Sequence, residues 1–517
     1  MFCSVTSAAI SGVEVVPVSV EVDVSTGMPF LSMVGFVTSQ VREAQERVRT
    51  ALRNLGITLP PKRITINLSP GDVRKEGTRF DLPIAAAVLE ALGEIPPDAL
   101  RNTMLLGELH LDGSVQQVTG VLPSVICAKE TGCRQCIVPE GNLLEARAVS
   151  GIQSVGVSDL RDLINIGRGK FSGPPCPAPD PSHPRSPAYH VDFSDIHGQK
   201  PVKRAAQIAA AGFHNILLCG PPGSGKSMTA ERIPTIMPDL LPEESMEISK
   251  IYSIVGLLPE NTALMRTRPF RAPHHTITPA SLCGGGMNPH PGEITLAHRG
   301  VLFLDELPEM NPATIEMLRE PLEEKKITIS RSGGTCVFPA SFILVAAMNP
   351  CPCGWYPDMN RCTCSQPKIQ AYRSRVSQAF LDRIDLRCEV PPANYEDLSD
   401  EKPDPVSSAV LRKGVLRAVA IQRGRYGNTG LIFNSELKAS DIPKYCPLTE
   451  DAQKLIQAAF GTFHMTARGY HHVLKTARTI ADIDGSEKIC EQHISEALCY
   501  RSSDAVGSRG DRPGISP

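Results

Sequence analysis

The stretch that decides the fold is Asn215-Ile-Leu-Leu-Cys219 followed by Gly220-Pro-Pro-Gly-Ser-Gly-Lys226-Ser227. A short apolar run leads into a loop of glycines and prolines, and a helical pattern follows. This order matches G-x-x-x-x-G-K-[ST] in the strand–loop–helix setting that phosphate-binding loops require. Glycines let backbone N–H groups wrap a phosphate, and the helix N-terminus adds a positive partial charge. We therefore predict that this segment binds a nucleoside triphosphate, ATP.

The same loop supplies groups for the phosphates and for a metal ion. Lys226 is predicted to neutralise the β- and γ-phosphates, and Ser227 to ligate Mg²⁺. The alternative is a glycine-rich turn that binds nothing. The predicted nucleotide-binding residues are Gly220, Pro221, Pro222, Gly223, Ser224, Gly225, Lys226 and Ser227.

Two later apolar runs end in polar residues that complete a hydrolytic site. Gly300-Val-Leu-Phe-Leu304 is typical of a buried parallel strand and is followed by Asp305 and Glu306. Asp305 is predicted to hold Mg²⁺ through water, and Glu306 to polarise the attacking water. The run at 342–348 ends at Asn349, which is predicted to orient that water or to contact the γ-phosphate. A cap at the end of the strand is the alternative for Asn349.

These motifs resemble the magnesium-chelatase-like AAA+ family, and within it the bacterial YifB/ComM group. Further matches are residues 268–275 (RPFRAPHH), 291–300 (PGEITLAHRG) and 302–310 (LFLDELPEM). The resemblance covers nearly the whole chain. It implies an ATPase that forms a homo-oligomer, expected to be a hexamer, and acts on single-stranded or branched DNA. The implied activity is that of a helicase or branch-migration motor in natural transformation or recombination.

Three other functions stay open from the sequence. A magnesium-chelatase motor subunit has a similar ATPase core and helps to insert Mg²⁺ into a porphyrin. A Lon-like protease would use the N-terminal part of the chain. A non-motor ATP switch or chaperone would need only the nucleotide site. Function beyond ATP hydrolysis therefore rests on the resemblance.

Two arginines gain roles from the resemblance. Arg383 stands where chelatase-type AAA+ proteins carry an arginine finger, which implies contact with the γ-phosphate of a neighbouring subunit. A salt bridge to Asp382 or Asp385 is its alternative. Arg468 stands at the "sensor 2" position, which implies that it couples nucleotide state to the angle of a helical lid. Arg478 is the fallback for that role, and an exposed helix arginine is the alternative for either.

Residues 327–338 are predicted to form a β-hairpin. Ile327-Thr-Ile-Ser and Cys336-Val-Phe flank the turn residues 332–334 (SGG). In related MCM-type helicases such hairpins point into the ring pore and touch DNA, so the resemblance implies a DNA contact here. The long interval between the phosphate loop and Asp305 leaves room for an insertion in the second helix, which this group carries.

The N-terminal part resembles a Lon-protease-type domain, with the fold of ribosomal protein S5 domain 2. The matching residues are 70–83 (PGDVRKEGTRFDLP) and 106–113 (LGELHLDG). Lon-type proteases use a Ser nucleophile and a Lys, but the matching positions are Arg79 and about Leu122, which cannot perform this chemistry. The resemblance thus implies a scaffold without proteolysis.

Basic residues of this part raise a separate possibility. Arg63, Arg74, Lys75 and Arg79 are considered as a basic patch for DNA, with ordinary solvated charge as the favoured alternative.

Four cysteines form one cluster directly after Asn349. Residues 351–364 read CPCGWYPDMNRCTC, and four thiolates in one loop suit a tetrahedral, structural Zn²⁺. The alternative is four unlinked thiols in a surface loop. The predicted ligands are Cys351, Cys353, Cys362 and Cys364. The pair Cys133 and Cys136 is interpreted as small residues beside a turn rather than as a metal or redox site.

The bulk composition sets limits on location and partners. The formal net charge is −2, so no global basic field draws the chain to nucleic acid, and any DNA contact must be local. No stretch is long and apolar enough for a membrane span, and the first residues read as a folded strand rather than a signal peptide. Sixteen cysteines without an export signal indicate reduced thiols and a cytoplasmic protein.

The predicted fold class is α/β throughout most of the chain. Periodicity predicts strands at 13–24 and 63–68 and helices at 39–55 and 82–92. Proline-rich sequence marks a linker, and the part after it alternates strands and helices until a mainly helical end. The predicted layout is a Lon-like domain at 1–165, a linker at 166–190, an AAA+ core at 191–395, an exposed connector at 396–408, a helical lid at 409–503 and a tail at 504–517.

Overall fold

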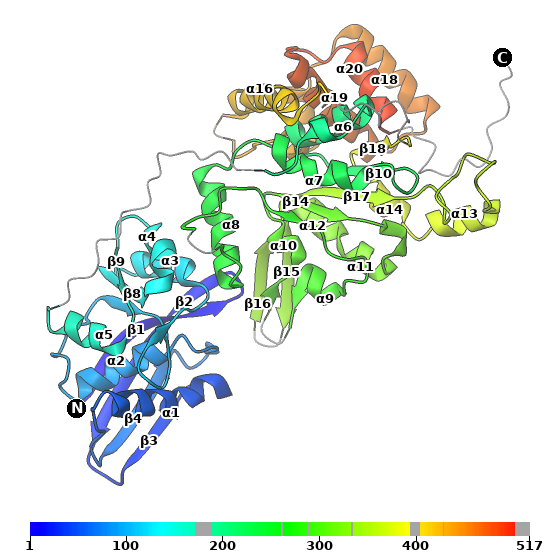
Figure 1. Ribbon diagram of the computed structural model, residues 1–517. Helices are drawn as coiled ribbons and strands as arrows, with labels where there is room; N and C mark the ends of the chain where they lie inside the picture. The colour runs from blue at the N-terminus through cyan, green and yellow to red at the C-terminus, as the bar shows by residue number, and fades with distance from the viewer. Residues whose placement is uncertain are drawn as a thin grey trace, which may run out of the picture.

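The computed structural model describes residues 1–170, 189–259, 262–286, 289–331, 334–392, 404–427 and 429–501. Figure 1 shows two separate β-sheets with helices around each, and a group of helices packed above the second sheet. The predicted mixed α/β class is therefore confirmed. Most of the predicted linker, most of the connector and the predicted tail lie outside the described residues, so the domain boundaries stay predictions.

The first sheet has seven strands in the order β3-β4-β2-β1-β5-β8-β9. β1 (Phe2–Ser11) and β2 (Glu14–Ser25) form a long antiparallel hairpin. Alternate residues of β2, from Val18 to Val24, are buried, as expected for a sheet covered on one face. The turn of this hairpin uses Gly12 with φ +66°, a conformation that favours glycine.

Helices cover this sheet close to their predicted positions. α1 (Ser39–Asn54) buries one face, whereas all residues of α2 (Asp81–Ala91) are buried, which explains its continuous apolar sequence. The remaining elements of this region are β3 (Phe30–Val34), β4 (Arg63–Ser69), β5 (Thr103–Leu105), β6 (Glu108–Leu109), β7 (Val115–Gln116), α3 (Val121–Glu130), β8 (Gln135–Pro139), α4 (Leu143–Arg147), β9 (Gln153–Val157) and α5 (Leu160–Gly167).

The second sheet has five parallel strands in the order β11-β14-β17-β10-β18. Its three central strands are buried along their whole length, because helices cover both faces of a parallel sheet. The carboxyl ends of β10, β14 and β17 meet at one edge, where the phosphate loop begins. The strands are β10 (Ile216–Cys219), β11 (Phe270–Arg271), β14 (Val301–Leu304), β17 (Ile343–Met348) and β18 (Leu386–Glu389).

Two small hairpins belong to this second region. β15 (Lys326–Arg331) pairs with β16 (Gly334–Pro339), so the predicted hairpin is confirmed. β12 (Gly284–Gly285) pairs with β13 (His290–Pro291) between two short helices, in the long interval before Asp305. The helices of the region are α6 (Lys200–Gly212), α7 (Lys226–Ile236), α8 (Pro242–Ile254), α9 (Pro279–Cys283), α10 (Glu293–Leu296), α11 (Pro312–Met317), α12 (Arg319–Glu324), α13 (Gln366–Arg373) and α14 (Gln378–Leu381).

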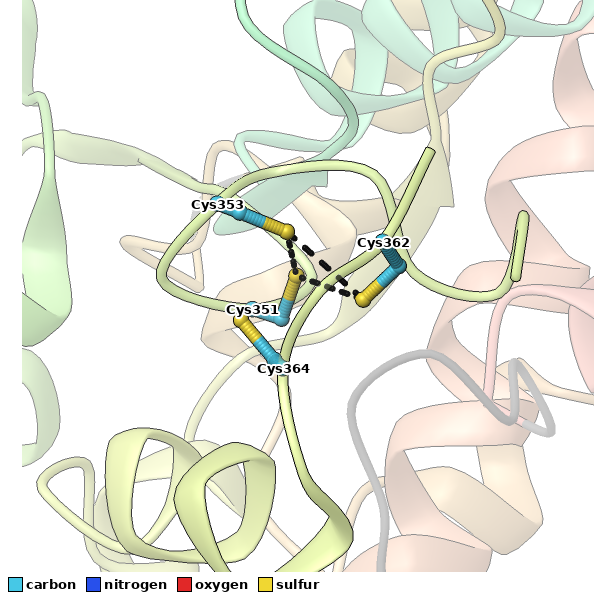
Figure 2. Close-up of side chains that lie close together, drawn as sticks. All are labelled: Cys351, Cys353, Cys362 and Cys364. Carbon is cyan, nitrogen blue, oxygen red and sulfur yellow. Dashed lines mark hydrogen bonds between the residues drawn. The ribbon is translucent and has the colours of Figure 1, made fainter. Parts of the chain in front are cut away.

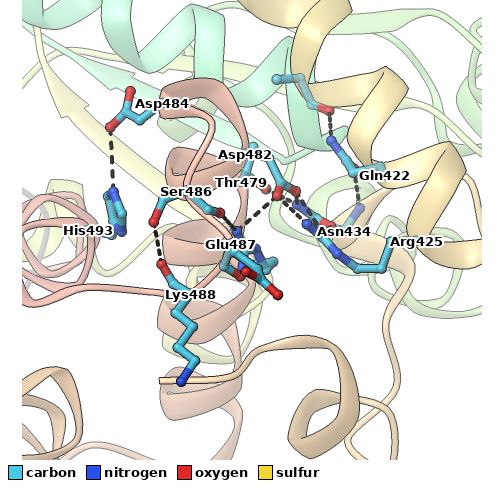
Figure 3. Close-up of polar contacts among 12 residues, drawn as sticks. Gln422, Arg425, Asn434, Thr479, Asp482, Asp484, Ser486, Glu487, Lys488 and His493 are labelled. Carbon is cyan, nitrogen blue, oxygen red and sulfur yellow. Dashed lines mark hydrogen bonds and ion pairs between the residues drawn. The ribbon is translucent and has the colours of Figure 1, made fainter. Parts of the chain in front are cut away.

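The last part of the chain is helical, as predicted. Its helices pack on α6 around a polar centre in which Asn434 donates to Asp482 and to Thr479, both at 2.9 Å (Figure 3). Arg425 donates to the same Asp482. The helices are α16 (Ser408–Tyr426), α17 (Ile442–Tyr445), α18 (Glu450–Thr462), α19 (Ala467–Asp484) and α20 (Glu491–Cys499).

The end of the predicted connector is not exposed throughout. Asp404 lies 2.8 Å from the buried ammonium of Lys203, and its carboxylate also accepts from the N–H of Gly198. A residue of the segment predicted to be an exposed connection therefore fixes the start of α16 against α6. The prediction was wrong at this residue because the burial of Lys203 depends on tertiary packing.

Candidate nucleotide site and cysteine cluster

The phosphate loop joins β10 to α7 at the carboxyl edge of the second sheet. Gly223 and Gly225 have φ of +73° and +87°, in the left-handed region that favours glycine. Gly220 lies so close to the carbonyl of Val390 that a Cβ would overlap it. The glycines of the motif are thus required by the backbone path.

Lys226 and Asn349 meet beside this loop. The Lys226 ammonium donates to the Gly220 carbonyl at 2.8 Å, to the Pro221 carbonyl at 2.9 Å and to the Asn349 side-chain oxygen at 3.1 Å. Burial lowers the pKa of Lys226, and the nearby charge of Asp305 partly offsets this effect. The loop after β10 and the end of β17 thereby place a cation and an amide side by side.

The two predicted Mg²⁺ ligands are also adjacent. The Ser227 hydroxyl donates to an Asp305 carboxylate oxygen at 2.9 Å. A hydroxyl and a carboxylate are the hard oxygen donors that Mg²⁺ prefers, and Mg²⁺ keeps several waters beside one or two such ligands. The chemistry of this pair therefore fits the ion.

Glu306 is held in an unusual backbone conformation. Its φ of +49° lies in the left-handed region, which is uncommon for a residue other than glycine and is often found at functional sites. Its carboxylate is 53% exposed and lies 3.0 Å from Nδ1 of His275. The sequence analysis used residues 268–275 only as a family match and missed this role of His275. The adjacent histidines of that motif were the available signal.

One carboxylate, that of Glu323, binds both the predicted arginine finger and the predicted sensor 2 arginine. It lies 2.9 Å from Arg383 and 2.6 Å from Arg468. Arg383 is 10% exposed and also donates to the Ala379 carbonyl at 2.5 Å. Its salt bridge is thus to Glu323 on α12, and not to the aspartates considered from the sequence. The two arginines meet although 85 residues separate the end of α14 from the start of α19. Their convergence is therefore a property of the tertiary fold.

The fallback Arg478 is excluded by its surroundings. Its side chain is fully buried, pairs with Asp482 at 3.0 Å and donates to the Glu487 carbonyl at 2.8 Å. These partners occupy it inside the helical group, so it is a structural residue and not a nucleotide sensor.

The four predicted zinc ligands form one cluster (Figure 2). Their Sγ atoms all lie within 4.8 Å of one another, and the Sγ of Cys351 is 3.3 Å from that of Cys353 and 3.8 Å from that of Cys362. In a tetrahedral site with Zn–S of about 2.3 Å, neighbouring sulfurs are about 3.8 Å apart. A hydrogen bond from the Trp355 backbone N–H is the main cause that lowers the pKa of Cys353 to about 6. The donor set therefore fits Zn²⁺, whereas Cys136 is a buried core residue of β8, as interpreted.

The cysteine loop also touches the phosphate loop. Gly354 has φ +85° and lies against the ring of Pro222, which a Cβ on Gly354 would overlap. The Arg373 side chain donates to the Pro350 carbonyl at 3.1 Å and stacks over Tyr356. The loop is thus fixed between α13 and the nucleotide site.

The considered basic patch in the N-terminal region does not exist. Lys75 is fully buried and donates to the Pro70 carbonyl, and Arg79 is 6% exposed. Arg74 pairs with Glu76 at 2.7 Å, which leaves Arg63 as the exposed member. The solvated alternative was equally wrong for Lys75 and Arg79, because both charges point inward.

Comparison with known proteins agrees with these motifs along the whole chain. Residues 20–142 match the family described as subunit ChlI of Mg-chelatase, residues 192–398 match magnesium chelatase, subunit ChlI, and residues 405–501 match its C-terminal part. The chain is 41% identical over 497 residues to the uncharacterized protein YifB of Escherichia coli K12, covering 96% of each chain. It is 40% identical over 498 residues to competence protein ComM of Haemophilus influenzae Rd, again covering 96% of each.

The chain belongs to the magnesium-chelatase-like YifB/ComM family. This membership makes it an AAA+-type ATPase. A shorter likeness, 30% identity over 129 residues, links 25% of the chain to 23% of Lon protease 2 of Bacillus subtilis. Among the helices that the structure describes, none is long and apolar enough to cross a membrane.

Proposed function

We propose that this YifB/ComM-family ATPase is a ring-forming motor that couples ATP hydrolysis to the remodelling of DNA. The observation that carries this proposal is the position of the β15–β16 hairpin. β16 ends at Pro339, three residues separate it from β17, and β17 leads directly to Asn349, whose side chain binds Lys226. A change at the γ-phosphate therefore has a short, rigid path to the hairpin.

Each residue of the nucleotide site has a role in the proposed hydrolysis. Lys226 would neutralise the phosphates, and Ser227 with Asp305 would hold Mg²⁺, which would offset charge on the phosphate oxygens. Glu306 orients the attacking water as a general base, and His275 at 3.0 Å positions its carboxylate. Because Asn349 binds Lys226, it lies where the lytic water and the γ-phosphate would meet.

The proposed arginine finger makes the active unit an oligomer. Arg383 is bound to Glu323 and Ala379 within its own chain rather than to a residue of the phosphate loop. A finger that acts on a neighbour's γ-phosphate stabilises the transition state by charge, typically by about 10³- to 10⁵-fold in rate. We assign this role to Arg383 and the companion, nucleotide-sensing role to Arg468, with a hexamer as the expected ring.

The proposed DNA contact is a local one on the hairpin. Lys326 and Arg331 at the two ends of β15 are exposed, as is Val337 on β16. Cations of this kind bind phosphates by releasing condensed counterions, without any need for a positive net charge of the whole chain. The relative named competence protein ComM, similar over 96% of the chain, supports a role with DNA.

ATP turnover with and without DNA tests the proposal. Single-stranded or branched DNA is expected to stimulate ATPase activity, and Arg331→Ala is expected to remove most of the stimulation while basal turnover stays. Arg417→Ala, at an exposed arginine of α16, is the matched control and is expected to behave as wild type. Absence of both DNA binding and stimulation would contradict the motor function and favour an ATP switch or chaperone. Porphyrin metallation by the chain would instead support the chelatase alternative.

A further inference from the structure

The last turn of α8 is bound by the N-terminal region at the start of α3. The N–H of Gly120 donates to the Ser253 carbonyl at 2.7 Å, and the Ser253 hydroxyl donates to the Glu145 carboxylate at 2.8 Å. The N–H of Leu122 donates to the same carboxylate at 3.3 Å. We call Gly120, Leu122, Glu145 and the neighbouring Arg79 the α3 docking surface. Helix ends present carbonyl groups that take partners from outside the helix, and this surface supplies one.

The α3 docking surface is buried and charged. Burial lowers the pKa of Arg79 to about 10 against the opposing attraction of Glu145, and burial raises the pKa of Glu145. Arg79 also donates to the Thr119 carbonyl at 2.7 Å. A buried charge is tolerated only when hydrogen bonds satisfy it, so the Ser253 hydroxyl is part of what makes Glu145 stable there. By the Lon resemblance, Arg79 stands at the position of the protease's Ser, and the position of its Lys lies near Leu122.

A second contact joins the N-terminal region to the same helix. Val13, in the turn between β1 and β2, packs against the apolar cluster of α8 that includes Ile248 and Ile251. Next to it, Gly12 lies beside Cys336 of β16. The β1–β2 turn therefore touches α8 and the proposed DNA-contacting hairpin together. In Figure 1, α8 stands between α3 and the second sheet.

The other end of α8 is linked to the helix that follows the phosphate loop. α7, which begins at Lys226, ends at Ile236, and α8 begins at Pro242. The buried guanidinium of Arg268 holds this link, because it donates to the Pro238 carbonyl at 2.7 Å and to Glu244 on α8 at 2.9 Å.

The side of α8 reaches the strand that carries Asp305. Glu247 lies 3.2 Å from His298 and 3.1 Å from Arg299, just before β14 begins. The Tyr252 hydroxyl donates to the Leu296 carbonyl at 3.0 Å. One helix thus contacts the link to α7, the segment that leads into β14 and the N-terminal region.

We propose that α8 couples nucleotide binding at the phosphate loop to the N-terminal region, and that the α3 docking surface is the part of that region to which α8 binds. Movement of α7 on phosphate binding shifts α8, and the N-terminal region follows because Gly120, Leu122 and Glu145 hold the helix end. Packed side chains, hydrogen bonds and rigid helices can carry coupling between distant sites, and α8 has such contacts at both ends. The former protease position is, on this proposal, a docking site for the chain's own helix. The inference goes beyond the action on DNA and does not depend on it.

Amide hydrogen exchange of residues 119–130 tests this coupling, because the N–H groups of Gly120 and Leu122 report directly on docking. In the wild-type protein, a slowly hydrolysed ATP analogue with Mg²⁺ is expected to change exchange in this segment and in α8 together. Ser253→Ala is expected to increase basal exchange of the segment by about tenfold or more and to abolish its response to nucleotide. The response of α8 itself should remain. Glu145→Gln, which keeps the side-chain size, is expected to act in the same way and serves if Ser253→Ala does not fold.

Ser249→Ala is the matched control on the same helix. The Ser249 hydroxyl donates to the Ser245 carbonyl at 2.6 Å and accepts from the Met265 N–H at 2.7 Å, so its partners all belong to the second region. This variant should keep the nucleotide response of residues 119–130. Nucleotide affinity, measured for every variant, shows that the phosphate loop is intact. The proposal is overturned if the segment ignores bound nucleotide in the wild type, or if Ser253→Ala and Glu145→Gln respond as the wild type does.

Discussion

The phosphate-loop edge and the α3 docking surface contain similar residue types in opposite surroundings. At the phosphate-loop edge, Lys226 is bound by neutral oxygens and the carboxylate of Glu306 is 53% exposed. At the α3 docking surface, Arg79 and Glu145 are buried, and Glu145 is satisfied by Ser253 of α8. The first site keeps its carboxylate accessible to a ligand from solution. The second gives its carboxylate to another part of the same chain.

This difference separates a catalytic group from a structural one more clearly than residue type does. An accessible carboxylate in a constrained backbone conformation can act on a substrate, and Glu306 has φ +49°. A buried carboxylate with every oxygen occupied cannot reach a substrate, but its loss disturbs the contact that it forms. Carboxylate chemistry is therefore expected at the phosphate loop alone, and mechanical coupling at the α3 docking surface.

A glutamate-to-glutamine substitution at each of the two sites is the strongest test of this difference. Glu306→Gln is expected to lower ATP turnover by about 100- to 10,000-fold with nucleotide binding retained, because an amide cannot act as a base. Glu145→Gln is expected to change turnover by less than about threefold, since effects at distant sites are largely independent. Steady-state ATPase rates and nucleotide affinities of the two variants provide the measurement. A loss of turnover in Glu145→Gln as large as that in Glu306→Gln would show that the two regions are not distinct.

The group formed by Glu323, Arg383 and Arg468 is intermediate between an accessible site and a buried contact. Arg383 is paired within its own chain but is proposed to act on the nucleotide of a neighbouring subunit. An equal mixture of Arg383→Ala and Glu306→Gln subunits should regain turnover at about one quarter of its sites. These are the sites that combine an intact Glu306 with an intact Arg383 from the neighbouring subunit. Each variant alone should be nearly inactive. The control mixture joins Glu306→Gln with Lys226→Ala, whose defects lie in the same subunit's site, and should recover nothing. If the first mixture also stays inactive, Arg383 does not act between subunits.

Local spacing made it predictable that the residues of the candidate nucleotide site meet. The phosphate loop is eight consecutive residues with fixed spacing, Asp305 and Asn349 each directly follow an apolar run, and Glu306 comes next after Asp305. Parallel strands bring their carboxyl ends to one edge, so the sequence order alone implied that these residues meet. The β15–β16 hairpin was predictable for the same reason, because both strands and the turn are local.

Contacts between distant elements were not predictable in this way. His275 reaches Glu306 across two neighbouring strands, and Glu323 joins Arg383 and Arg468 from separate helices. The inward direction of Arg79 was missed because periodicity shows which face is apolar, not which charge will be paired inside. The docking of α8 on α3 depends on how the regions around two different sheets pack together, and no motif encodes that contact.

A substitution in the cysteine loop gives the smallest expected effect on the nucleotide site. It tests whether this loop supports the shape of the phosphate loop. Cys353→Ser should remove about one zinc per chain, because three thiolates hold the ion less well than four. Since Gly354 in this loop packs on Pro222, nucleotide affinity should fall by about two- to fivefold as the loop loosens, a change far below the loss expected for Glu306→Gln. Metal analysis and nucleotide titration measure the two effects. Cys133→Ser, at a half-buried cysteine outside the cluster, should leave both unchanged. Unchanged zinc in Cys353→Ser would remove the metal assignment, whereas lost zinc with unaltered nucleotide affinity would mean that the phosphate loop keeps its shape without support from Gly354.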